Sequence, residues 1–238
     1  MCLIVFEISE DPARGLLLAA NRDEFYDRPT LAAAAWEDAP EIFAGRDLVG
    51  GGTWLGISGS GRFAAVTNYR DPKAPKGTRS RGELVSGFLS SGVSTGDYLD
   101  TIASAAEEFS GFNLIVGSAG RDGFEAAYFS NREGLIRHLE PGVYGLSNHL
   151  LDTPWPKVRR AKEMFSAAAA DDDNALFELL SDRTLASDDE LPDTGIGLER
   201  ERLLSPIFIE TPIYGTRCST VVRVNTESPP QLVERVHV

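Results

Sequence analysis

Two apolar, β-prone runs at the start of the sequence constrain the fold more than any other feature. The first is Met1-Cys2-Leu3-Ile4-Val5-Phe6, the second is Leu16–Ala20, and the turn-like segment 10–15 between them contains proline and glycine. Two such runs joined by a short turn predict a β-hairpin. Because Asn21-Arg22-Asp23-Glu24 continues the second run, the hairpin would bring Cys2 close to residues 21–23.

The cysteine at position 2 places a candidate nucleophile at the start of this hairpin. Removal of Met1, which the small side chain of Cys2 permits, would leave one residue with both a thiol and a free α-amine. In model compounds the amine titrates near pH ~8 and the thiol near ~8.5, so each can exchange a proton with the other close to neutrality. Cys2 would then hold a nucleophile and its base, as acyl transfer requires.

Composition narrows the classes of function. The formal net charge of the 238 residues is -13, which argues against nucleic acid as a partner, because such binding needs a basic surface. Only 4 of the 23 basic residues are lysine, an acidic bias that resembles proteins of salt-loving organisms.

No stretch approaches the ~18 apolar residues of a membrane span, and the start lacks the basic region of a secretory signal, so we expect a cytoplasmic protein. Cys2 and Cys218 are too few for a disulfide framework or a four-ligand zinc site, and we expect neither a metal nor a cofactor.

Strand and helix signals alternate along the rest of the chain. The pattern predicts strands at 54–57, 62–68, 112–117, 124–129, 135–139, 143–146, 207–209, 221–224 and 232–236. It predicts helices at 84–89 after a capping box at 80–83, at 97–109 with Thr95 as cap, at 154–168 with Thr153 as cap, at 174–180 capped by 171–173, and a helical turn at 199–204. The glycine cluster 50–52 is expected to form a tight turn. This order fits an α+β chain with two sheets packed face to face between helices, a four-layer αββα sandwich forming a single domain over residues 1–238.

Short motifs spread over nearly the whole chain point to a family. They are Met1-Cys2, Asn21-Arg22-Asp23-Glu24, Ala44-Gly45-Arg46-Asp47, Gly51-Gly52-Thr53-Trp54, Thr67-Asn68-Tyr69-Arg70, Ser80-Arg81-Gly82-Glu83, Leu146-Ser147-Asn148-His149 and Tyr214-Gly215-Thr216-Arg217. Together they resemble the NRDE family, whose eukaryotic members are called transport and Golgi organization protein 2. That family is in turn similar to the N-terminal-nucleophile hydrolases of the penicillin V acylase and bile salt hydrolase group, which have the αββα fold.

The resemblance implies roles for residues near Cys2. Asn21-Arg22-Asp23 matches an Asn-x-Asp element of the hydrolase group, so Asp23 would hold the N-terminal amine. The arginine that precedes this element in the group is Ala20 here, so Arg22 or Arg217 would replace it.

Further roles follow for residues that lie after strands. Asn68 and Asn148 would supply oxyanion and substrate contacts, and their amides can donate to a developing oxyanion. We expect further substrate contacts from Asn21, Trp54, Tyr69 and His149.

Each of these residues also has a purely structural interpretation. Arg22 and Asp23 could be an ion pair that fixes the hairpin, Asn68 and Asn148 turn residues, His149 a packing group, Trp54 and Trp155 core aromatics, and Cys218 a buried thiol.

Two functions from different classes therefore remain. The first is an N-terminal-nucleophile cysteine hydrolase that cleaves an amide or related acyl bond of a small molecule through an acyl-Cys2 intermediate. The second, implied by the resemblance, is a non-catalytic carrier or chaperone for haem or for an acyl-CoA or lipid ligand. No Cys-x-x-Cys-His motif is present, and His138, His149 and His237 are the available imidazoles. An anionic substrate would be repelled by the acidic chain unless arginines such as Arg22, Arg46, Arg70 or Arg217 line the cleft.

Overall fold

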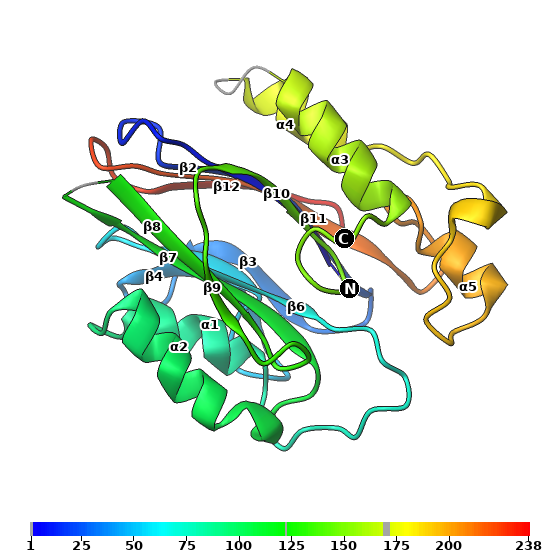
Figure 1. The fold of residues 1–238 in the computed structure, drawn as a ribbon, viewed down its shortest axis with the longest axis horizontal. Helices are drawn as coiled ribbons and strands as arrows, with labels where there is room; N and C mark the ends of the chain where they lie inside the picture. The colour runs from blue at the N-terminus through cyan, green and yellow to red at the C-terminus, as the bar shows by residue number, and fades with distance from the viewer. Residues whose placement is uncertain (1, 122, 169–171) are drawn as a thin grey trace.

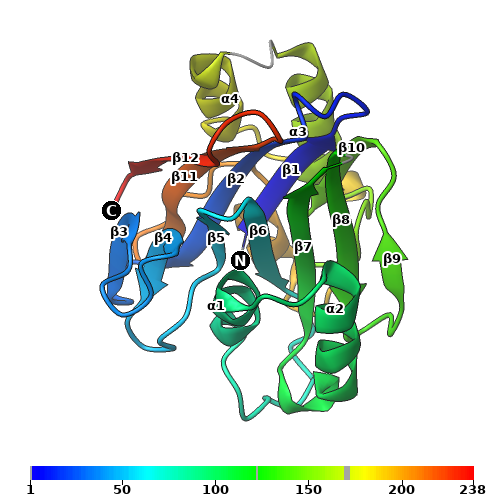
Figure 2. The ribbon, with the colours of Figure 1, turned by 90° about the vertical axis from the view of Figure 1, so that its left-hand side faces the viewer.

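The strands pair into two antiparallel sheets that lie face to face (Figures 1 and 2). The computed structural model describes residues 2–121, 123–168 and 172–238. Over these ranges, one sheet has five strands in the order β10 (Gly142–Leu146), β1 (Cys2–Ile8), β2 (Leu16–Phe25), β11 (Tyr214–Val224) and β12 (Gln231–Val236). The other, counted over the same residues, has seven in the order β3 (Thr30–Ala35), β4 (Ile42–Asp47), β5 (Leu55–Ser58), β6 (Arg62–Asn68), β7 (Phe112–Gly120), β8 (Gly123–Ser130) and β9 (Ile136–His138).

Helices cover the outer face of each sheet. They are α1 (Gly82–Ser90), α2 (Thr95–Ser104), α3 (Pro156–Ala167) and α4 (Asp173–Leu180), and the short α5 (Leu198–Leu203) lies to one side of the sheets (Figure 1). Figure 1 shows α3 and α4 above the sheet that contains β1, and α1 and α2 below the sheet that contains β6. None of the helices within the described ranges is long and apolar enough to cross a membrane.

Three apolar clusters hold these layers together. Strand side chains alternate between faces, so Ile4 and Phe6 of β1 point between the sheets, where they join Phe63 of β6. Leu3 and Val5 point the other way and pack under α3 and α4. A third cluster joins α1 and α2 to the second sheet. Phe6 is fully buried, which is worth roughly 1.5–3 kcal/mol relative to an exposed side chain. The predicted four-layer αββα sandwich is confirmed.

The predicted N-terminal hairpin is β1 and β2, and it occupies the middle of its sheet. Cys2 lies opposite Arg22, and Ile8 lies opposite Leu16. On the far side of β2, β11 pairs along its whole length, from Tyr214 to Val224. The chain ends of this hairpin therefore lie between the two sheets and beside late segments of the sequence.

Helix starts differ from the sequence prediction at two places. Ser94, not Thr95, caps α2, because its Oγ accepts a hydrogen bond from the Asp97 N–H at 3.2 Å. Thr153 does not cap α3, since its hydroxyl lies 2.8 Å from His149 Nδ1 and the helix begins after Trp155 without a side-chain cap.

Three further boundaries are settled by the structure. The helix predicted over 97–109 ends at residue 104 and is followed by a 3₁₀ turn, Ala106–Glu108. Asp172 caps α4, and Asp171 and Met1, to which the sequence also assigned roles, lie outside the described residues. The predicted strand at 207–209 is wrong, because backbone groups of this segment bond to the side chains of Asn21 and Thr216 instead of to a ladder.

Two glycines bring α1 against the loop between β4 and β5. A Cβ on Gly52 would lie 2.4 Å from the Gly82 carbonyl carbon, and a Cβ on Gly82 would lie 3.1 Å from the Gly52 backbone. Only glycine permits such an approach. The cluster 50–52 therefore does more than turn the chain, because it docks the start of α1 at one end of the layer between the sheets.

Candidate active site

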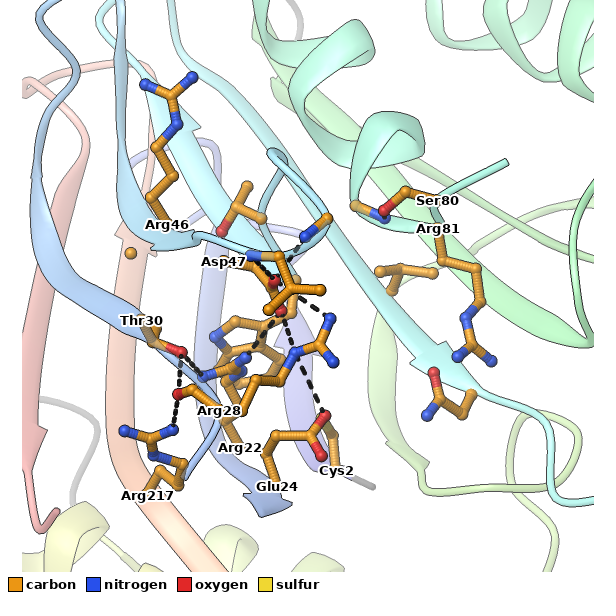
Figure 3. A pocket seen from close by; sticks show the side chains of 18 of the residues that line it. Cys2, Arg22, Glu24, Arg28, Thr30, Arg46, Asp47, Ser80, Arg81 and Arg217 are labelled. Carbon is orange, nitrogen blue, oxygen red and sulfur yellow. Dashed lines mark hydrogen bonds and ion pairs between the residues drawn. The ribbon is translucent and has the colours of Figure 1, made fainter. Parts of the chain in front are cut away.

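A cavity of about 620 Å³ opens at that end of the layer between the sheets (Figure 3). Its walls come from the ends of β1, β2 and β11, from β3, β4 and the loop that follows, and from the segment leading into α1. Of the residues to which the sequence assigned roles, it is lined by Cys2, Arg22, Asp23, Trp54, Asn68 and Arg217. Segments far apart in the sequence thus meet around Cys2.

Cys2, Arg22 and Cys218 form a row across β1, β2 and β11. Cys2 and Cys218 both lie opposite Arg22 in the strand register, and directly opposed residues share a sheet face. All three line the cavity. Two strand spacings separate the Cα atoms of the two cysteines, roughly 9.6 Å, which is too far for a disulfide. Both cysteines are free.

The Cys2 thiol is buried at 7% exposure. Burial raises its pKa, the nearby Asp23 carboxylate raises the pKa further, and the Arg22 guanidinium acts against both. A thiol in this environment is protonated near neutrality, and it becomes a nucleophile only if a base takes its proton as it reacts.

Arg22 reaches the cavity but is held on its other side. Its Nη2 lies 3.2 Å from Asp47 Oδ2, and its Nη1 donates to Thr30 Oγ1 at 3.0 Å. Arg28 also binds Asp47, with Nε 2.6 Å from Oδ2. Arg217 donates to backbone carbonyl groups, including that of Phe25 at 3.2 Å. The structure therefore places Arg22 beside Cys2, whereas Arg217 forms part of the cavity wall.

Asp23 follows Arg22 and points to the opposite sheet face, as strand alternation requires. Its Oδ1 accepts a hydrogen bond from Thr216 Oγ1 at 2.7 Å. Burial raises the pKa of this carboxyl, and the Lys157 ammonium is the largest opposing influence. Lys157 is itself 4% exposed, and its Nζ has no hydrogen-bond partner within the described residues. Burial lowers the pKa of Lys157 to about 8, with Asp23 acting in the opposite direction.

Asn68 and Asn148 have different positions. Asn68 lines the cavity, and its side-chain amide has no hydrogen-bond partner among the residues that the structure describes. Asn148 is fully buried behind it and donates from Nδ2 to the Asn68 carbonyl at 2.9 Å. Ser147 Oγ donates to the Cys2 carbonyl at 3.1 Å. The segment 147–148 therefore ties β6 to β1, and Asn68 is the amide that faces the cavity.

Three expected substrate contacts lie outside the cavity wall. Asn21 is fully buried and donates from Nδ2 to the carbonyl groups of Leu180 and Ile207 at 2.8 and 3.0 Å. His149 lies between Tyr69 Oη and Thr153 Oγ1, each at 2.8 Å. The structure does not bring Asn21, Tyr69 or His149 to the cavity that contains Cys2, because their polar atoms are engaged elsewhere.

Two residues that sequence reasoning did not single out belong to this environment. Arg81 lines the cavity, although the sequence presented it as the second position of a capping box. Lys157 lies behind Asp23, and its signal was available, because it shares a helix face with the buried Ala161 and Phe165 four and eight residues later. A lysine on the apolar face of a helix needs a charged partner.

No group of three or more His, Cys, Asp or Glu residues within the described ranges is arranged to hold a metal ion. His138, His149 and His237 do not line the cavity. The thiols of Cys2 and Cys218 are thus the soft ligands that its walls offer.

Comparison with solved structures identifies a protein of similar fold. The chain is similar to a Caenorhabditis elegans N-acylethanolamine-hydrolyzing acid amidase ortholog, with a TM-score of 0.55 and 11% sequence identity, over 98% of this chain and 100% of that chain. The chain therefore shares the fold of this amidase, in agreement with the predicted αββα architecture.

Sequence comparison identifies the family. The family profile of Transport and Golgi organisation 2 matches residues 1–237. A Bos taurus relative, Transport and Golgi organization protein 2 homolog, is 39% identical over 257 residues, covering 99% of this chain and 92% of the relative. The Drosophila melanogaster Transport and Golgi organization protein 2 is 31% identical over 98% of this chain and 91% of its own length. The chain belongs to the transport and Golgi organisation 2 family, and the resemblance seen in its motifs is confirmed.

Proposed function

We propose that this chain is a cysteine hydrolase of the N-terminal-nucleophile type, acting on an amide or related acyl bond of a small molecule. One observation carries the proposal: Cys2, on the first strand, lines a cavity of about 620 Å³ beside Arg22 and together with Asn68, whose amide has no hydrogen-bond partner among the described residues. A nucleophile, a cation and an amide donor are the groups that acyl transfer uses.

The reaction begins after Met1 has been removed. The Cys2 thiol gives its proton to the neighbouring α-amine while sulfur attacks the substrate carbonyl carbon. The carbonyl oxygen becomes an oxyanion, which Asn68 Nδ2 stabilises. The carbon–nitrogen bond then breaks, the α-ammonium returns the proton to the leaving amine, and a thioester on Cys2 remains. Water, deprotonated by the same amine, attacks the thioester and releases the carboxylic acid and the thiol.

The electrostatics of Cys2 favour a base on the same residue. Burial raises the thiol pKa, so a free thiolate is scarce at neutral pH. A base within the same residue avoids this difficulty, because proton transfer and attack proceed together. On the other face of the sheet, the Asp23 carboxylate supplies the negative charge that would orient the α-ammonium, and Lys157 lowers the pKa of this carboxyl.

The test has two parts. Intact-protein mass spectrometry should show loss of Met1, and incubation with p-nitrophenyl octanoate should add one octanoyl group to the mature chain. The acyl group should map to Cys2 and be absent in Cys2→Ala. A retained Met1, or equal acylation of Cys2→Ala, would overturn the proposal.

The carrier alternative uses the same cavity. The cavity wall offers haem no imidazole, so haem would have to bind through the thiol of Cys2 or Cys218. Titration with haem should therefore give no saturable Soret shift if the chain is a hydrolase. A saturable shift that is lost in Cys2→Ala or Cys218→Ala would favour the carrier.

A further inference from the structure

The charge of the cavity is opposite to that of the chain. The net charge of the chain is -13. Among the described residues that line the cavity, seven are cationic and four are acidic. The cationic residues are Arg22, Arg28, Arg46, Lys76, Arg79, Arg81 and Arg217, and the acidic ones are Asp23, Glu24, Asp47 and Glu234. A basic cavity in an acidic protein favours an anionic ligand.

Most of these cations already have carboxylate partners. Arg22 and Arg28 bind Asp47, Arg46 binds Asp38 at 2.6 Å, and Arg79 binds Glu83 and Glu108. These pairs balance their own charge, and they build the wall rather than attract a ligand.

Arg81 differs from its neighbours. It is partly buried, and no carboxylate forms an ion pair with it within the described part of the chain. Nη1 donates to the Gly111 carbonyl at 3.1 Å, and Nε and Nη2 have no hydrogen-bond partner among the described residues. Figure 3 shows Arg81 on the wall opposite Arg22, Glu24 and Cys2. One edge of the guanidinium is thus anchored and the other is left for a ligand.

The position of Arg81 is fixed by its backbone. Gly82, the next residue, lies against Gly52, where a Cβ would come within 3.1 Å. Burial lowers the pKa of Arg81, and Cys2 and Glu24 act in the opposite direction. The guanidinium therefore borders the same cavity as Cys2, and Glu24, which also borders it, lies 3.9 Å from Arg28.

We propose, on the basis of the hydrolase function above, that the substrate carries an oxyanion close to its scissile carbonyl and that Arg81 binds this group. A guanidinium edge matches the two oxygens of a carboxylate or phosphate. The structural neighbour is named for N-acylethanolamines, whose leaving group is neutral. This chain would instead select an acyl compound with an anionic leaving group, such as an N-acylated amino acid.

Binding to the Cys2→Ala variant tests selectivity without turnover, so the result does not depend on hydrolysis. The ligands are N-dodecanoylglycine and N-dodecanoylethanolamine, which differ in a carboxylate against a hydroxymethyl group, and the O-phosphorylated ethanolamide. Calorimetry should show tighter binding of the anionic ligands, weakened by salt. Arg81→Gln in the same background should weaken anion binding roughly 10- to 100-fold, as expected for a lost charge-assisted hydrogen bond. The ethanolamide should be unaffected.

Matched variants separate charge from folding. Arg81→Lys keeps the charge and should retain part of the preference. Arg14→Gln removes a charge at the far end of the hairpin, where Arg14 pairs with Glu7, and should change nothing. The relative affinity of the glycine and phosphate ligands shows which oxyanion is taken. Equal binding of charged and neutral ligands, or a preference that survives Arg81→Gln, would overturn the proposal even if Cys2 is acylated.

Discussion

The sheet that contains β1 and β2 has one face toward the cavity and one toward the helices, and side chains on the two faces have different surroundings. Arg22 and Asp23 are consecutive on β2 and both border the cavity, but the Arg22 side chain lies on the face of Cys2, whereas the Asp23 carboxylate accepts a hydrogen bond from Thr216 on the helix face. On the cavity face, charged groups border open space. On the helix face, Asn21, Asp23 and Lys157 are all less than 5% exposed and are surrounded by protein. We infer that the cavity face carries the chemistry, whereas the helix face fixes the geometry and charge of the strand end.

The largest expected effect falls on the cavity face. Cys2→Ala should abolish acylation by p-nitrophenyl octanoate, because the attacking sulfur is lost. Cys218→Ala is the matched control, since Cys218 lies on the same face beyond Arg22, and it should retain acylation. Intact mass after incubation distinguishes them. Loss of acylation in Cys218→Ala alone would show that the nucleophile is Cys218 on β11 and not Cys2 on β1.

The second largest effect is expected when the side-chain donor to the oxyanion is removed. Asn68→Ala should slow acylation roughly 10²- to 10³-fold, about 2.7–4 kcal/mol, which is the usual cost of one lost donor. The thermal stability should change little, because no hydrogen bond to this side chain is lost among the described residues. Rates of p-nitrophenol release and a melting curve measure both. An unchanged rate would remove Asn68 from the site.

A substitution on the helix face should lower the stability of the protein and leave the acylation rate nearly unchanged. Asn21→Ala removes the side-chain donor to the carbonyl groups of Leu180 and Ile207, and it leaves the Ser219 hydroxyl with His237 as its remaining partner. Buried groups left unsatisfied should lower the free energy of unfolding by about 2–3 kcal/mol. Chemical denaturation measures this loss. The acylation rate of the folded fraction should stay within a few-fold, and a selective loss of rate would contradict the division between the two faces.

The smallest effect depends on pH. Lys157→Met removes the cation that lowers the pKa of Asp23, so the raised pKa of this buried carboxyl should rise further. A raised folded-state pKa contributes stability at low pH that is lost as pH rises through that pKa. The variant should therefore lose more stability than the wild type between pH ~4 and ~7, because its Asp23 carboxyl ionises less readily in the folded state.

Lys162→Met is the control for this pH dependence. Lys162 lies on the same helix but pairs with Asp152 at 2.7 Å near the surface. Its removal should shift stability by a similar amount at both pH values. Denaturation of the two variants at each pH gives the comparison, and parallel curves for Lys157→Met and the wild type would show that Lys157 does not control Asp23.

Sequence patterns predicted the layers because they depend on local periodicity. The hairpin of β1 and β2, the helices near 84–89 and 174–180, and the αββα order follow from alternation and helical spacing. The cluster around Cys2 followed from the hairpin and the family motifs. Whether Cys2 is a nucleophile remains a prediction, as does the role of Asp23.

Contacts between distant segments could not be predicted in this way. Arg81 enters the cavity because Gly82 meets Gly52, and periodicity does not report such a contact. Asn148 follows a strand as Asn68 does, yet only Asn68 faces the cavity, because Asn148 Nδ2 is used to hold the Asn68 carbonyl. The strand predicted at 207–209 failed because its backbone groups bond to side chains and to separate backbone groups, such as the Asp182 carbonyl, instead of to one neighbouring strand.

The pairing of β1 and β2 with late strands also sets when the site can form during synthesis. Ile4 pairs with Leu146, and Leu16 pairs with Val224, so the wall beside Arg22 is missing until nearly the whole chain has left the ribosome. Contacts so distant in sequence form slowly. A nascent or truncated chain that lacks β11 would therefore expose its thiol without a complete cavity around it, and reactivity toward substrate would arise only once β11 has been made and paired.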